Sequence, residues 1–96
     1  MSEREQYIEK AKARIHQWNA DIDKMKAKAD EAEADAKINY QKQLKEMRTQ
    51  RDEAEAKLKE LREASDDAWH DMKSGFDKAW DSLSSSFASA MSRFKG

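Results

Sequence analysis

Two histidines are the side chains best suited to acid–base chemistry or metal binding near neutral pH, and their placement indicates neither. His16 and His70 lie 54 residues apart, and neither belongs to a zinc-binding pattern. Asp66 and His70 are four residues apart and can share a helix face, but a solvated helix start explains them better than a metal site. We therefore expect no metal ligands and no cofactor.

Carboxylates are abundant, since 20 of the 96 residues are Asp or Glu. General acid–base catalysis needs a pair of them held in a desolvated cleft that separates their pKa values, and a helical rod has no cleft. The sequence contains no cysteine nucleophile and no glycine-rich phosphate-binding loop. We therefore expect no catalytic residues, no small-molecule substrate and a protein that is not an enzyme.

The elements that carry these side chains are predicted by composition. Charged residues make up 41% of the chain, but 19 Lys and Arg against 20 Asp and Glu leave a net charge of −1. Alanine is the commonest apolar residue, whereas Leu, Ile and Phe number eleven and Val is absent. Such a chain, with no Pro and two Gly, is typical of long helices and coiled coils. The fold class predicted is all-α.

A heptad pattern of apolar residues follows the first two thirds of the chain. The apolar side chains recur at steps of three and four residues, which is the signature of a coiled-coil seam. Arg51 stands where an apolar residue is expected, and we interpret it as a marker of register or oligomer state. The seam predicted to mediate self-association consists of Ile8, Ile15, Trp18, Ile22, Met25, Tyr40, Leu44, Met47, Leu58 and Leu61.

The seam passes through residues 27–37, where alanine is the only apolar residue and the stripe shifts by one position. Alanine, lysine and acidic residues hold a helix while burying little surface, so we expect this stretch to be thin but unbroken. An acidic residue four positions before a basic residue stabilises a helix, and three pairs with this spacing favour one continuous helix: Glu33–Lys37, Glu53–Lys57 and Glu55–Lys59. We predict one helix over about residues 3–64, on the order of 90 Å long. It forms an N-terminal coiled-coil domain of residues 1–64, which must self-associate to cover its stripe.

Residues 65–96 are predicted to form a second, aromatic-rich amphipathic helix. Ser65 followed by two aspartates is a helix-start signal. Three arrangements stay open, namely a turn at residues 64–67, a hinge at residues 74–75 and a nearly straight rod. The apolar face of this helix carries Trp69, Phe76, Trp80, Leu83, Phe87, Met91 and Phe94.

Two roles are open for this apolar face. Bulky apolar residues opposite a serine-rich, weakly charged face are typical of helices that bind lipid packing defects. A helix that docks on its own protein has the same pattern. Docking is favoured, because residues 66–95 span the same helical rise as residues 32–61 and can fold back along them, giving a helical hairpin or an oligomeric bundle.

Several runs resemble a family of short bacterial coiled-coil proteins, found in cyanobacteria and proteobacteria and sometimes labelled stress-response proteins. They are residues 29–37 (ADEAEADAK), 40–44 (YQKQL), 58–61 (LKEL), 64–65 (AS), 68–69 (AW) and 79–81 (AWD). The two runs that contain tryptophan are the most specific. The resemblance extends over about residues 20–95 and implies a helical, non-enzymatic protein, with no family catalytic residues to carry over.

Charge and the N-terminal sequence bear on partners and location. Acidic residues follow Lys24, Lys26 and Lys28 within two helical turns and cancel their positive charge. Acidic residues also flank the basic edge formed by Lys42, Lys45, Arg48 and Arg51, so we expect no nucleic acid partner. The polar N-terminus leads into no apolar signal-peptide core, which favours the cytoplasm. We therefore expect a self-associating, non-enzymatic structural or interaction protein, which the resemblance links to stress. The alternative is a peripheral membrane-surface protein that binds lipid through its last helix.

Overall fold

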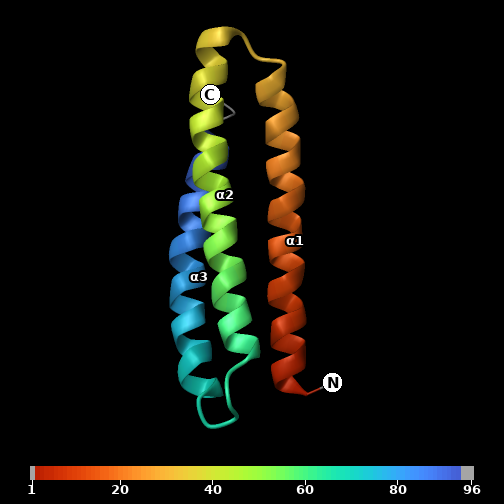
Figure 1. Ribbon diagram of the computed structural model, residues 1–96, viewed down its shortest axis with the longest axis vertical. Coiled ribbons are helices and arrows are strands. Elements are labelled where there is room, and N and C mark those ends of the chain that lie inside the picture. The colour runs from red at the N-terminus through yellow and green to blue at the C-terminus, as the bar shows by residue number, and fades with distance from the viewer. Residues whose placement is uncertain (1, 94–96) are drawn as a thin grey trace.

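A computed structural model describes residues 2–93, which form three α-helices packed side by side (Figure 1). Helix α1 spans Glu3–Asp30, α2 spans Ala34–Arg62 and α3 spans Trp69–Ser92. Sequential helices are antiparallel, so α1 and α3 run in the same direction. The prediction of an all-α protein is confirmed.

The prediction of one continuous helix over residues 3–64 is wrong. The chain reverses at residues 31–33, and the longest dimension of the bundle is 52 Å. Glu31 keeps a helical backbone (φ −87°, ψ −9°), whereas Glu33 is extended (φ −66°, ψ 160°) and begins α2. Among residues 2–93 no side-chain-bearing residue has a positive φ, so the reversal requires neither glycine nor proline.

Tertiary packing explains why the helix breaks here. A single rod would keep a few more backbone hydrogen bonds but would leave its apolar stripe in water, and helices in proteins are stabilised mainly by packing of that stripe. Residues 27–37 carry no bulky apolar anchor that the break would remove. The acidic run also suits a helix start, because Asp35 lies in the first turn of α2, near the positive end of its dipole. None of the three acid–base pairs expected to support continuity is an ion pair among residues 2–93.

The second reversal lies between Arg62 and Trp69, at the turn position considered from the sequence. Ser65 organises it, because its hydroxyl accepts a hydrogen bond from the N–H of Ala68 (3.2 Å) and its carbonyl accepts from the N–H of Trp69 (3.0 Å). Gly75 lies within α3 and forms no hinge. After this turn, α3 lies beside α2.

Arg4 fastens the beginning of α1 to the end of α2. Its Nη1 pairs with Asp66 (3.2 Å), and its guanidinium lies 5.0 Å from the centroid of the Trp69 ring. Carbonyl groups near a helix C-terminus run out of partners within the helix, and Arg4 Nη2 lies within hydrogen-bond distance of three carbonyl oxygens at the end of α2 and just beyond it. The acceptors are the carbonyl oxygens of Leu61 (3.4 Å), Arg62 (3.1 Å) and Ala64 (2.6 Å).

The predicted seam lies inside the bundle. Ile8 and Tyr40 are half-buried against the core. The other seam residues are buried, namely Ile15, Trp18, Ile22, Met25, Leu44, Met47, Leu58 and Leu61. The stripe is therefore covered within one chain, and the need to cover it no longer requires a second copy.

The apolar face of α3 also points inward. Trp80 and Met91 are half-buried, and Phe94 lies outside the described residues. The buried members of the face are Trp69, Phe76, Leu83 and Phe87. Among the described residues, α3 packs this face against the rest of the same chain.

Gly75 provides a direct test of the helical assignment of α3. A Cβ added at Gly75 would meet no atom within 4 Å, and the backbone there is helical. We expect Gly75→Ala to raise the free energy of unfolding by about 0.5–1 kcal/mol, because alanine loses less backbone entropy in a helix. Urea denaturation monitored by circular dichroism measures this. A loss of stability would contradict it and would restore the hinge.

Candidate functional site

Aromatic rings bridge α1 and α3, whose backbones approach each other less closely than those of the sequential helix pairs. Trp18 of α1 lies between Trp80 and Phe87 of α3, with centroid distances of 4.6 Å and 4.3 Å and interplanar angles of 15° and 5°. Stacked pairs of this kind add about 0.5–1.5 kcal/mol each to the free energy of burial. Trp18 therefore joins two helices that do not follow one another in the chain.

Further ring contacts lie closer to the N-termini of α1 and α3. Tyr7 of α1 meets the edges of Trp69 (5.7 Å, 86°) and Phe76 (6.0 Å, 74°). Phe76 in turn lies 6.1 Å from Trp80. The six rings form one continuous row, here called the ring row, in the order Trp69, Tyr7, Phe76, Trp80, Trp18 and Phe87.

Tyr7 also makes a polar contact between α1 and α3. Its hydroxyl donates a hydrogen bond to Oδ1 of Asp77, and the Lys73 ammonium lies 5.1 Å from the ring centroid. Burial, the hydrogen bond to Asp77 and the charge of Asp77 together raise the pKa of Tyr7 well above its ordinary value of 10.0. The hydroxyl therefore remains a donor throughout the neutral range.

A groove of about 230 Å³ lies beside the ring row, between α1 and α3, and is here called the α1–α3 groove. Ala11, the buried apolar residue between Tyr7 and Trp18 on this side of α1, offers only a methyl group where those neighbours carry rings. The guanidinium of Arg14 lies 5.8 Å from the centroid of the Trp80 ring. The lining is completed from α1 by Tyr7 and Lys10 and from α3 by Phe76 and Asp77.

Two further surface hollows are more polar. One of about 350 Å³ lies between α1 and α2, with Ile15 and Leu58 at its base and His16, Lys59 and Arg62 among its other residues. Between α2 and α3, Gln50 lines a hollow with Ser86 and Ser89, and its buried Oε1 has no hydrogen-bond partner among the described residues. Neither hollow is lined by Tyr, Phe or Trp.

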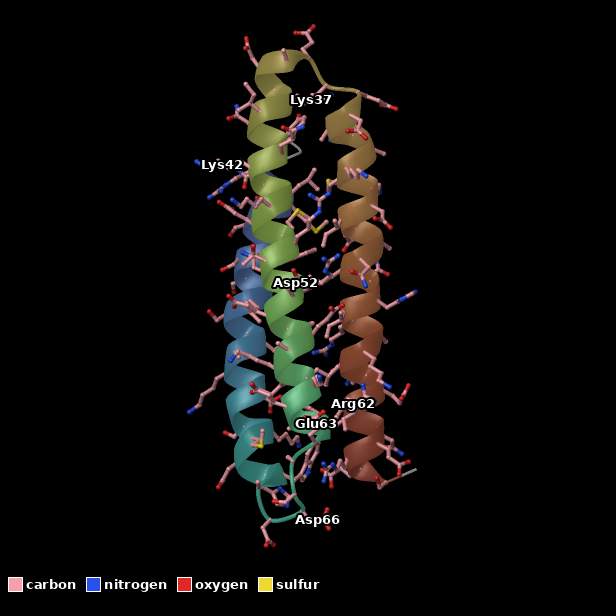
Figure 2. The ribbon with its side chains drawn as sticks, viewed as in Figure 1. Lys37, Lys42, Asp52, Arg62, Glu63 and Asp66 are labelled. Atoms are coloured by element: carbon pink, nitrogen blue, oxygen red, sulfur yellow. The ribbon has the colours of Figure 1, made fainter. Side chains whose placement is uncertain are left out.

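The histidines and the basic edge can now be placed. Asp66 pairs with Arg4 at the lower turn, where Figure 2 labels it, and His70 is exposed. Residues 2–93 contain no group of three His, Cys, Asp or Glu side chains arranged to hold a metal ion. Lys42 extends away from the bundle (Figure 2). Arg51, the polar residue in the seam, is half-buried and pairs with Asp52 of α2, to which its Nε (3.1 Å) and Nη2 (2.9 Å) donate. Its Nη1 donates to Oδ1 of Asn19 (3.1 Å), so one of its partners lies on α1 of the same chain.

The α1–α3 groove was not predicted from the sequence. The heptad placed Ile8 on the seam, yet Tyr7 lies four residues before Ala11 and eleven before Trp18, a spacing that returns to the same face of a helix. That spacing was the sequence signal that Tyr7 shares a helix face with Ala11 and Trp18. Nothing distinguishes Lys10, Arg14 and Asp77 from the other charged residues of the chain until the helices are paired.

Comparison of the chain with protein-family models, with curated proteins and with solved structures finds no match in any of the three. None of the helices in residues 2–93 is both long and apolar enough to cross a bilayer. The described chain is a small, highly charged three-helix bundle with a groove between α1 and α3 that is lined by three aromatic rings.

The hydroxyl of Tyr7 makes the stability of the bundle pH-dependent. Its raised pKa means that the folded chain keeps a proton that the unfolded chain releases above pH 10, so this contribution is complete below pH 10 and is lost as the pH rises further. We expect Tyr7→Phe to cost roughly 0.5–1 kcal/mol at pH 7 through the lost hydrogen bond. The variant should also lose less stability than the parent between about pH 10 and pH 11. Urea denaturation at several pH values measures both effects, and parallel pH curves for the two proteins would contradict the assignment.

Proposed function

We propose that the protein is a non-enzymatic helical interaction protein that associates with a second copy of itself. The observation that carries this proposal is the unequal length of the helices. Arg93, directly after α3, contacts Gln43 (2.9 Å) and Glu46 (3.6 Å) of α2. The first turns of α2 and the last turns of α1 therefore extend beyond the described part of α3 (Figure 1). Residues 24–42, which make up this extension, are here called the hairpin end.

The hairpin end carries apolar surface that two helices cover incompletely. Ile38 is 68% exposed and is the one large apolar side chain among the described residues to be so exposed. Ala36 and Tyr40, in the same turns of α2, are half-buried. A second copy presents the same surface, so a two-fold arrangement can pair two hairpin ends and shield both copies of Ile38. The surface is small, which favours a weak, concentration-dependent dimer.

The rest of the molecule agrees with a role in binding rather than catalysis. Net charge near zero leaves little overall repulsion between copies, and both signs of charge are present along the chain. The resemblance to bacterial stress-response coiled-coil proteins supports the same class of role and suggests a connection with stress.

Substitution of Ile38 tests this proposal. We expect the parent mass from light scattering to rise toward that of a dimer as the concentration increases through roughly 10–500 μM, a range typical of weak interfaces. Ile38→Glu should remain monomeric, because a buried carboxylate without a partner opposes the contact. Ala56→Glu is the matched control, since Ala56 is an exposed residue of α2 outside the hairpin end. A monomeric parent, or dimerisation unaffected by Ile38→Glu, would refute the proposal.

The second candidate function is binding to a membrane surface through α3. Its specific support is the outer face of this helix, where Ser82, Ser85 and Ser89 are exposed and charge is sparse. Lipid contact would require α3 to leave the bundle, because Phe76 and Phe87 are 6% and 2% exposed. That separation costs the burial of the whole apolar face, so we place this candidate behind self-association.

A double substitution separates the two candidates. We expect Trp80→Ser with Phe87→Ser to lower the free energy of unfolding by at least about 3–5 kcal/mol, the scale of a large aromatic residue removed from a core. We also expect the parent to stay in the supernatant when small neutral vesicles are sedimented. A parent that pellets with the vesicles, and a double variant that melts normally but no longer pellets, would make the membrane the partner.

A further inference from the structure

The α1–α3 groove combines three aromatic rings with two exposed, positively charged side chains. Tyr7, Phe76 and Trp80 give it three aromatic walls, and the buried Ala11 keeps it open. Lys10 and Arg14 are exposed beside these walls. Rings beside permanent positive charge match a ligand with an apolar ring and an anionic group.

The charges of the groove specify the ligand further. Lys10 and Arg14 bring two positive charges and Asp77 brings one negative charge, so the three together leave one positive charge. One oxygen of Asp77 already accepts the hydrogen bond from Tyr7. Neither Lys10 nor Arg14 has an ion-pair partner among residues 2–93, so both are available as donors. A single carboxylate on the ligand would neutralise the groove, and the fork of an arginine can bind it through two hydrogen bonds.

The size of the groove limits the ligand to one small ring system. Its volume of about 230 Å³ is below the roughly 300–1,000 Å³ of sites for drug-sized molecules. We propose that the α1–α3 groove binds a small aromatic monocarboxylate, with the ring against Phe76 and Trp80 and the carboxylate at Lys10 and Arg14. The sequence led us to expect no small-molecule substrate, and the inference concerns a bound ligand that undergoes no reaction.

Phenylacetate is the probe for the first test, followed by ¹⁵N chemical shifts in the full chain. We expect shift changes concentrated at residues 7–14 and 76–80, with a dissociation constant on the order of 1 mM, as suits a ligand of this size. Acetate lacks the ring, benzyl alcohol lacks the charge and phenethylamine reverses it. Each should bind at least about tenfold more weakly, because each loses one of the two recognition features. Equal binding of acetate, or shifts spread over the whole surface, would overturn the proposal.

Charge variants test the same site from the protein side. Lys10→Gln with Arg14→Gln should weaken phenylacetate binding at least about tenfold, since both donors to the carboxylate are lost. Lys45→Gln with Arg48→Gln is the matched control, because it removes one exposed lysine and one exposed arginine of α2 that lie outside both the groove and the hairpin end. Unchanged binding in the first variant, or equal weakening in the control, would overturn the proposal.

Ala11→Leu tests the shape of the groove. A larger side chain at its base should abolish binding of phenylacetate while the circular dichroism spectrum stays helical. If this variant does not fold, the charge variants still decide the question. The groove contains no residue of the hairpin end, so Ile38→Glu should bind phenylacetate as the parent does. A failure of the ligand proposal and a failure of self-association are therefore distinguishable.

Discussion

The stacking of Trp18 between Trp80 and Phe87 is the contact on which the arrangement of the three helices depends. Each sequential pair of helices is brought together by a short turn, but α1 and α3 share no turn. With only eight Leu and Ile residues and no Val in the chain, aliphatic side chains could not fill the wider space between these two helices. Rings span that space, and the hydrogen bond from Tyr7 to Asp77 adds a polar contact across it. The third helix therefore adds to the core of the hairpin rather than only covering α2.

The sequence predicted much of what is buried but not which surface buries it. Composition was sufficient for the all-α class, and three- and four-residue spacing assigned Ile15, Leu44 and Leu58 to an apolar seam between chains. These residues are buried within one chain. The same spacing describes a seam between two chains and a seam within one chain, so it could not separate an oligomer from a hairpin. The break at residues 31–33 was missed because every residue there favours helix locally, and the gain that opposes it comes from packing distant segments. The acidic residues that begin α2 were the local signal for a new helix start.

The candidate site was less predictable than the core. Its rings lay partly within the predicted apolar faces, since Trp18, Phe76 and Trp80 were assigned to them. The groove beside the rings depends on Ala11, a residue whose small size matters only because α3 passes over it. Arg51 illustrates the same dependence on pairing. Its position in the seam was evident from the heptad, but Asn19 as its partner followed only from the antiparallel pairing of α1 and α2.

The contacts between α1 and α3 also have a consequence for the order of folding. Arg4 and Asp66 are separated by 62 residues in sequence, and Tyr7 and Asp77 by 70. Pairing of sequential helices closes short loops, whereas the ring row can form only when nearly the whole chain is ordered, at a greater cost in loop-closure entropy. We therefore expect the two hairpins to form early and the ring row to close last. In that late step Trp18 and Trp80, which are 62 residues apart in the sequence, are expected to leave water and stack on each other.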